Sequence, residues 1–169
     1  MRELPVILCL EGRPCVVVGG GAVGARRAQA LAEAGARVRV VDPSPCEALE
    51  ALSLAGKLEL TRRPVEASDL DGAFLVVVAT NDPRVNLAVA ELAAARGALL
   101  NRADDATQGD LRFMARARRG PITLAVSVRP AAPAVSRDLV RELAGRVDQA
   151  WLDRAALAAR RRRSVPGDR

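Results

Sequence analysis

Short apolar runs alternate with segments of helical periodicity through the first hundred residues. The runs are continuous and rich in valine and leucine, which is typical of strands buried on both faces of a parallel sheet. Strands are therefore predicted at Cys15–Val18, Arg37–Val41, Leu58–Thr61, Phe74–Ala79 and Ala98–Asn101. Because strands and helical segments alternate over short connections, right-handed crossovers and an α/β fold are expected.

The helical segments carry their own start and stop signals. Helices are predicted over residues 22–34, 44–56 and 82–96. The first ends before Gly35, a typical C′ glycine. Ser44 and Glu47, with a proline between them, have the spacing of a capping box, so the second helix is expected to begin there. Asp82, followed by a proline, is the predicted start of the third.

The pattern changes after about residue 110. A β-branched strand is predicted at Pro121–Val128 and an amphipathic helix at Ala134–Arg146, and residues 147–163 continue as a helix before a basic tail. One strand and one helix cannot bury their apolar faces alone, so they are expected to pack on the first domain or on a second copy of the chain. The predicted division is therefore 1–113, 114–146 and 147–169.

A glycine cluster follows the first strand. Gly19, Gly21 and Gly24 satisfy the pattern G-x-G-x-x-G, with Ala22 and Val23 opening the helix that follows. In this context the glycines permit a tight turn, a close backbone approach to a pyrophosphate and close helix packing, and the helix N-terminus faces the anion. The cluster predicts a dinucleotide site, against the alternative of a glycine-rich turn without a ligand.

Two further strand ends carry polar residues suited to such a site. Asp42, followed by Pro43, lies 18 residues after Gly24, near the spacing expected of a carboxylate on the adenosine ribose. Its negative charge would repel a 2′-phosphate, which favours NAD over NADP. Thr80 and Asn81 follow the fourth strand, so they are expected to line the nicotinamide side of the cleft.

Composition narrows the chemistry. The chain has no histidine, which excludes Ser-His and Cys-His catalysis and the commonest transition-metal ligand. Its three cysteines lack metal-type spacing and fit a reducing compartment. No signal peptide or membrane span is recognised, so a cytoplasmic protein without membrane contact is expected.

The basic residues are concentrated late in the chain. After residue 100 there are 15 arginines and 8 acidic residues. Such a surplus attracts nucleic acid, a membrane surface or a small polycarboxylate, although a codon bias toward arginine is an equally weighted explanation. Aromatic residues, which usually stack on bases, are scarce, and this disfavours a nucleic-acid partner.

Four segments in order resemble one family. GRPCVVVGGGAVGARRAQALAEAGARVRVV, LDGAFLVVVATNDPRVN, LLNRADD and RGPITLAVS, all within residues 4–146, are similar to the precorrin-2 dehydrogenase/sirohydrochlorin ferrochelatase family, the N-terminal module of siroheme synthases. The resemblance implies a Rossmann-like parallel sheet, a small α+β dimerisation domain, a short C-terminal helical region and a homodimer. No methyltransferase domain is recognised, so a stand-alone module is expected.

The resemblance also implies an activity. Family members oxidise precorrin-2, a tetrapyrrole polycarboxylate, to sirohydrochlorin with NAD, and some then insert ferrous iron as a second substrate. The family's catalytic aspartate, a general base, falls on Asp104 in the N-x-x-D segment. Asp105 beside it would raise the pKa of Asp104 if both faced the pocket. Arg102, Arg112, Arg116 and Ser127 are the expected substrate contacts, since guanidinium groups pair with carboxylates.

The chain departs from the family pattern in two places. The glycine-rich turn after the RGPITLAVS strand is replaced by Ser127–Pro133, which lacks both glycines, and no proline follows in the segment around Phe113. Both changes fall on the substrate and dimer side, so they put iron insertion in more doubt than dehydrogenation. Three alternatives stay open: a bifunctional chelatase, a non-catalytic NAD-binding redox sensor and, more remotely, a nucleic-acid binder. The residues that would meet iron are unassigned.

Overall fold

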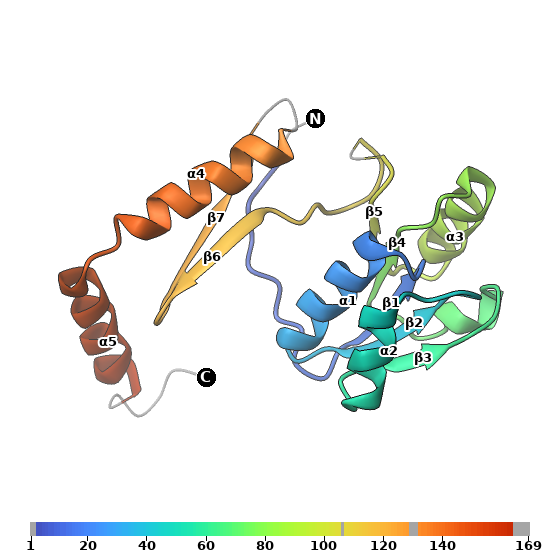
Figure 1. The fold of residues 1–169 in the computed structure, drawn as a ribbon, viewed down its shortest axis with the longest axis horizontal. Coiled ribbons are helices and arrows are strands. Elements are labelled where there is room, and N and C mark those ends of the chain that lie inside the picture. Colours follow the sequence, from blue (N-terminus) through green and yellow to red (C-terminus); the bar gives the residue numbers. More distant parts are fainter. Residues whose placement is uncertain (1–2, 106, 129–131, 164–169) are drawn as a thin grey trace. The chain divides into compact units, whose positions relative to one another are not determined.

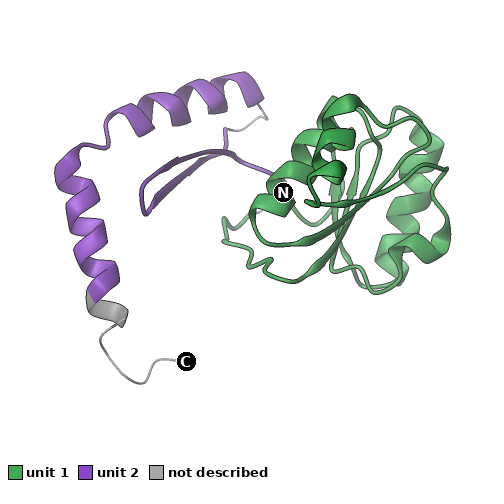
Figure 2. Ribbon diagram, turned by 60° about the horizontal axis from the view of Figure 1, so that its bottom comes forward, with its two compact units in different colours: residues 1–112 green, residues 113–169 purple. Residues whose placement is uncertain are grey.

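The computed structural model describes residues 3–105, 107–128 and 132–163. They form two compact units, residues 1–112 and residues 113–169 (Figure 2). The altered turn of the family pattern falls partly on residues 129–131, which lie outside the described residues.

The first unit is built on a parallel sheet, as predicted. Its five strands have the order β3-β2-β1-β4-β5, and every neighbouring pair is parallel (Figure 1). The strands are β1 (Pro14–Val18), β2 (Arg37–Val41), β3 (Glu59–Thr61), β4 (Leu75–Val78) and β5 (Leu99–Arg102). This is the strand order of a Rossmann-like sheet, so the predicted fold class is confirmed.

The centre of the sheet is made of short aliphatic side chains. Val17, Val76 and Val77 are completely buried, and all four residues of β4 are buried. Strands β1 and β4 lie side by side in the middle, which explains why both read as unbroken apolar runs. Cys15 belongs to this core, and burial raises the pKa of its thiol to about 11.

Helices cover both faces of the sheet. The helical elements of this unit are α1 (Ala22–Glu33), α2 (Glu47–Leu54), the 3-10 turn η1 (Ala67–Leu70) and α3 (Pro83–Ala95). The crossovers place α1 and α2 on one face and α3 with η1 on the other (Figure 1). Gly35 follows α1 with a φ of 81°, so its prediction as a C′ glycine is confirmed.

The start of α2 differs from the prediction. Its N-cap is Cys46, without a side-chain capping bond, so the capping box predicted at Ser44 and Glu47 was wrong. The reason is that the N–H of Ser44 donates to Asp42 Oδ1 at 2.7 Å, which holds Ser44 in the turn after β2. A capping box does occur at Glu66 and Asp69, at the start of η1.

The second unit is a hairpin with two helices. Strands β6 (Ala115–Arg119) and β7 (Ile122–Val126) are antiparallel, and α4 (Pro133–Gly145) packs against both. Helix α5 (Gln149–Arg163) is separate from α4, whereas the sequence predicted one continuing helix. The predicted strand corresponds to β7, and it pairs with β6. Strand β6 was not predicted because its sequence, ARARR, has no apolar run.

Within the described part of the chain, no helix is long and apolar enough to cross a membrane.

Candidate cofactor and proton-transfer site

Four strand ends meet at one edge of the first unit. Val18, Val41, Val78 and Arg102 are in register across β1, β2, β4 and β5. The residues that follow them, including the glycine cluster, Asp42, Thr80 and Asp104, therefore gather at the carboxyl edge of the sheet. In open α/β sheets this edge binds ligands.

The glycine cluster makes a turn that only glycine fits. Gly19 has a φ of 115°, and a Cβ placed there would lie 2.5 Å from the carbonyl oxygen of Ala79 at the end of β4. A Cβ on Gly24 would lie 1.9 Å from the carbonyl oxygen of Gly19. The sequence predicted that Gly24 brings α1 close to the strand. In the structure Gly24 mainly brings α1 close to the backbone of the glycine loop.

Gly21 has different surroundings. A Cβ there would meet nothing within 4 Å, and Gly21 is the N-cap of α1 without a side-chain capping bond. The first-turn N–H groups of Ala22, Val23 and Gly24 have no acceptor within the helix. No acidic residue lies in this turn. The space at Gly21 and the uncapped helix end fit the pyrophosphate of a dinucleotide.

Asp42 connects β2 to the glycine loop. Its Oδ2 accepts a hydrogen bond from the N–H of Gly20 at 2.7 Å, and its Oδ1 accepts one from Ser44. A Cβ on Gly20 would lie 2.8 Å from the Cβ of Asp42, so the glycine loop and the segment after β2 are in close contact. Each carboxylate oxygen retains a second lone pair for a ribose hydroxyl. Pro43 follows as an exposed residue.

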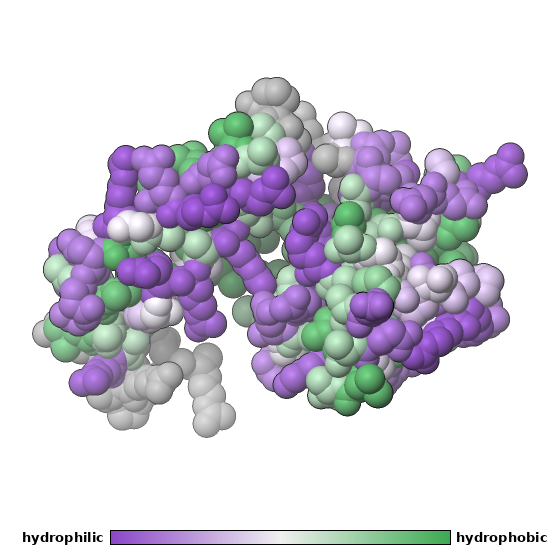
Figure 3. Space-filling model, in the orientation of Figure 1, coloured by the Kyte–Doolittle hydropathy of each residue, from purple (hydrophilic) through white to green (hydrophobic). Residues whose placement is uncertain are grey.

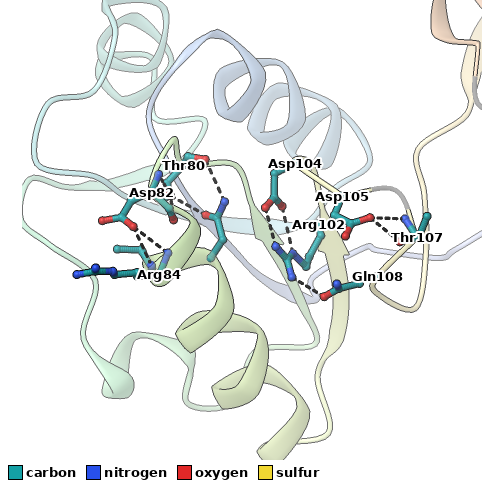
Figure 4. A network of polar contacts seen from close by, with 10 residues as sticks. Thr80, Asp82, Arg84, Arg102, Asp104, Asp105, Thr107 and Gln108 are labelled. Atoms are coloured by element: carbon teal, nitrogen blue, oxygen red, sulfur yellow. Dashed lines mark hydrogen bonds and ion pairs between the residues drawn. The ribbon is translucent and has the colours of Figure 1, made fainter.

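Thr80 is held by a residue of α3. Its Oγ1 donates to Asn86 Oδ1 at 2.6 Å, and Asn86 Nδ2 donates to the backbone oxygen of Thr80 at 3.1 Å. Asn86 is 1% exposed and Thr80 is partly buried, so the buried amide of this pair holds the threonine in place. Asp82 is the N-cap of α3 and accepts from the N–H of Arg84 at 2.8 Å (Figure 4), as predicted. Asn81 is exposed.

Asp104 is bound by Arg102. Arg102 Nε donates to Asp104 Oδ1 at 3.1 Å and Nη2 donates to Oδ2 at 2.6 Å, while Nη1 donates to Gln108 Oε1 at 2.6 Å (Figure 4). The side chain of Arg102 is 9% exposed and that of Asp104 is 30% exposed. The carboxylate is therefore fixed in orientation and still accessible.

The electrostatics of Asp104 differ from the expectation. Arg102 lowers the pKa of Asp104 from its ordinary value, and a hydrogen bond with Asn86 acts in the same direction against the effect of burial. Asp105 does not share this site, since its Oδ1 accepts from the N–H and the hydroxyl of Thr107, which lower its pKa as well. A mutual rise in pKa was expected only if both carboxylates faced one pocket, and their different partners outweigh the raising effect of Asp104 on the pKa of Asp105.

The other predicted substrate contacts are divided between the two units. Arg112 pairs with Glu3 in the first unit. Arg116 is an exposed residue of β6 opposite Ala125, and Ser127 is exposed just after β7, so both belong to the second unit. Their contact with a substrate stays a prediction. No group of three or more Cys, Asp or Glu side chains that could hold a metal ion occurs among the described residues.

Sequence reasoning missed two buried residues of the site. Asn86 was read only as part of a family motif, and its spacing of four from Asp82 was the available signal. Asn101, which is 2% exposed, donates from Nδ2 to the backbone oxygen of Leu111 at 2.9 Å and braces the segment after β5.

A hollow of about 600 Å³ lies at the other edge of the sheet. Its lining includes Pro14, Arg37 and Lys57, at or next to the amino ends of β1, β2 and β3. It is therefore not the dinucleotide site, which the glycine loop places at the carboxyl edge.

Known proteins resemble this chain over most of its length. It is 39% identical over 165 residues to a siroheme synthase of Pseudomonas entomophila and 34% identical to one of Nitrosococcus oceani, covering 98% of this chain in each case. The chain spans about a third of the length of these relatives, 36% and 35%. A solved structure titled "SirC, precorrin-2 dehydrogenase" matches 99% of this chain and 84% of its own, with a TM-score of 0.80 and 28% identity.

The fold and the glycine loop define a dinucleotide-binding protein. The chain belongs to the family described as "Putative NAD(P)-binding", which matches residues 6–115. The resemblance found in the four sequence segments is confirmed by the siroheme synthase relatives and the SirC structure.

Proposed function

We propose that this chain catalyses the NAD-dependent oxidation of precorrin-2 to sirohydrochlorin. The observation that carries the proposal is the likeness to SirC, which covers nearly the whole chain, including both units. The glycine loop and an oriented carboxylate at one sheet edge support it, because a dehydrogenase needs a cofactor and a base in reach of one substrate.

The reaction gives Asp104 a defined task. Bound NAD supplies the acceptor for a hydride from a C–H bond of the substrate. A proton must leave from the adjacent atom of the substrate at the same time. The electron pair of the bond that held this proton then forms the new double bond. Asp104 is ionised at neutral pH, since its pKa is lowered, and 30% of its side chain is exposed, so its carboxylate is the proposed acceptor of that proton.

An anaerobic assay with precorrin-2 and NAD tests this function. We expect NADH formation by the purified protein and a loss of about 100-fold or more in kcat for Asp104→Asn, the usual range for removing a general base. Asp105→Asn is the matched control and should retain activity, because its carboxylate contacts Thr107 instead. Dinucleotide binding without turnover in the wild-type protein would support the redox-sensor alternative. Added ferrous iron, with siroheme absorbance as the readout, decides whether the chain is also a chelatase.

We further propose NAD rather than NADP as the cofactor. The supporting feature is the Asp42 carboxylate beside the glycine loop, which would oppose a 2′-phosphate. Titration calorimetry should give tighter binding of NAD, and Asp42→Asn should shift the ratio of the two dissociation constants toward NADP by at least about tenfold. Tighter binding of NADP by the wild-type protein would contradict the proposal.

A homodimer is the proposed assembly. Among the described residues of the second unit, Val140 and Ala144 are the only buried apolar side chains. On α4, Val135, Leu139 and Leu143 are at least 36% exposed and are spaced by four, so they share one side of the helix. Figure 3 shows hydrophobic residues at the surface in the region of α4 and α5. A second copy of the chain is the proposed cover for this side of α4.

A cytoplasmic location is also proposed. The feature that supports it is the free state of the three cysteines, Cys9, Cys15 and Cys46, which suits a reducing compartment.

A further inference from the structure

Arg102 has an unusual environment for an arginine at the end of a strand. It is the last residue of β5, and its side chain is 9% exposed. Side chains of this type are almost never so buried unless they are paired. Its three nitrogens donate to partners within residues 104–108: two bind Asp104 and one binds Gln108.

The contact between Arg102 and Asp104 is bidentate. Two parallel N–H···O bonds of 3.1 and 2.6 Å fix the plane of the carboxylate as well as its position, which a lysine could not do. Gln108 holds the third nitrogen at 2.6 Å and so prevents the guanidinium from turning. Asp104 thus has a fixed orientation before any substrate binds.

The sequence alone suggested a different use for Arg102, as a contact for a substrate carboxylate. The geometry disfavours that use, because Nε, Nη1 and Nη2 all donate to groups of the protein and little of the side chain reaches solvent. Asp104, in contrast, keeps 30% of its side chain exposed. The accessible member of the pair is the carboxylate.

We propose that Arg102 is a positioning residue of the dehydrogenase: it holds the Asp104 carboxylate in the orientation that takes the proton leaving with the hydride. The inference rests on the proposed function. Among the described residues, Arg102 is the charged group that acts most strongly on Asp104, and the side chain that reaches it from α3 is the neutral Asn86. The adjacent Asp105 interacts with Asp104 through like-charge repulsion. Arg102 is therefore the dominant charge at this carboxylate.

Two variants separate charge from orientation. Arg102→Gln removes both, so kcat should fall about 10- to 100-fold with little change in KM, as for a misplaced catalytic group. The acid limb of the pH–rate profile should move to higher pH, because Asp104 loses the cation that favours its ionised form. Arg102→Lys keeps the charge, so its acid limb should stay close to that of the wild-type protein, while kcat is still reduced.

Arg39→Gln is the matched control. It removes an arginine from a single-bond pair with Glu59 in β2 and β3, 3.2 Å long and exposed, and should change neither kcat nor the acid limb. A rise in KM at unchanged kcat in Arg102→Gln would overturn the proposal and identify Arg102 as a substrate contact. An unchanged kcat and pH profile in that variant would overturn it too.

A readout without turnover keeps this test separate from the proposed function. Carbon-13 NMR titration of the aspartate carboxyls in the protein without cofactor, with the Asp104 signal assigned through Asp104→Asn, should show a higher pKa of Asp104 in Arg102→Gln. If the wild-type protein does not oxidise precorrin-2 but this shift occurs, the proposed function fails while the hold of Arg102 on Asp104 is established. An unshifted Asp104 in Arg102→Gln would overturn the positioning role.

Discussion

Gly21 and Gly24 stand three residues apart in one loop and have opposite surroundings. A methyl group on Gly24 would overlap the carbonyl oxygen of Gly19, whereas one on Gly21 would meet open space. Gly21 also has an extended backbone, with φ −76° and ψ −175°, which alanine adopts without strain. Gly24 is required by the fold, whereas Gly21 is required only if a ligand occupies that space.

Alanine at Gly24 should therefore lower the stability of the fold, whereas alanine at Gly21 should lower the affinity for NAD. Gly24→Ala should lower the free energy of unfolding by about 3 kcal/mol, as expected for a forced overlap with backbone. Gly21→Ala should change stability by less than about 0.5 kcal/mol and still weaken NAD binding, because its methyl group takes the space beside the uncapped helix end. Urea denaturation and calorimetric NAD titration measure the two effects. Unchanged NAD affinity in Gly21→Ala would show that the pyrophosphate does not bind beside Gly21.

At the same scale, the sequence predicted residue types better than their partners. The glycines and Asp42 were identified from spacing, since the dinucleotide pattern constrains where each stands along the chain. The pairing of Arg102 with Asp104 could not be predicted, because it depends on how the chain bends after β5. Asp105 shows the same limit: its turn toward Thr107 follows from local hydrogen bonding that spacing does not reveal.

At the scale of elements, η1 depends on an ion pair between the buried carboxylate of Asp69 and the partly exposed guanidinium of Arg63. Arg63 donates to both oxygens of Asp69, at 2.7 and 2.8 Å, and Asp69 also accepts from the N–H of Glu66. The Asp69 side chain is 4% exposed, and Arg63 lowers its pKa from the ordinary value. Because the folded-state pKa is the lower one, the pair stabilises the fold above the ordinary pKa of about 3.9. This stabilisation is lost as the pH falls through the lowered pKa.

Asp69→Asn should reproduce that loss at neutral pH. We expect the free energy of unfolding at pH 7 to fall by about 1–3 kcal/mol, the range for hydrogen bonds to a charged group. The difference from the wild-type protein should narrow as the pH falls through the lowered pKa of Asp69. Denaturant titrations at several pH values measure both. Asp71→Asn is the control, because Asp71 is 66% exposed in its pair with Arg96 and should matter little. A constant difference at all pH values would contradict this account.

Elements differed in how far the sequence predicted them. The central strands β1 and β4 were found because burial on both faces requires continuous apolar residues. Arg37–Val41 was predicted with the bounds that β2 has, although its two arginines are exposed. Strand β6 was missed because its outward positions carry Arg116 and Arg118, and only the alternate alanines face inward. The start of α2 was misplaced because Asp42, from another element, holds Ser44 outside the helix.

At the scale of the whole molecule, the described residues of the second unit include only two buried apolar side chains, Val140 and Ala144. The proposed dimer predicts that Leu139→Asp, on the exposed apolar side of α4, shifts the protein from dimer to monomer in sedimentation velocity at micromolar concentration. A charge on this side would have to be buried in the interface. Arg141→Asp is the control, since Arg141 is 79% exposed in its side chain and should leave the assembly unchanged. A monomeric wild-type protein at that concentration would exclude the proposed assembly.

The bond between Asp42 and the Gly20 amide has a kinetic consequence. The Asp42 carboxylate and the Cys46 amide already hold the glycine loop in place by hydrogen bonds. Little of the binding free energy of NAD is therefore spent on ordering this loop. Association should then follow a single phase whose rate rises linearly with NAD concentration in stopped-flow fluorescence. In hydrogen–deuterium exchange, the Gly20 amide should be protected even before NAD is added, and rapid exchange at this amide would show that the loop forms only around its ligand.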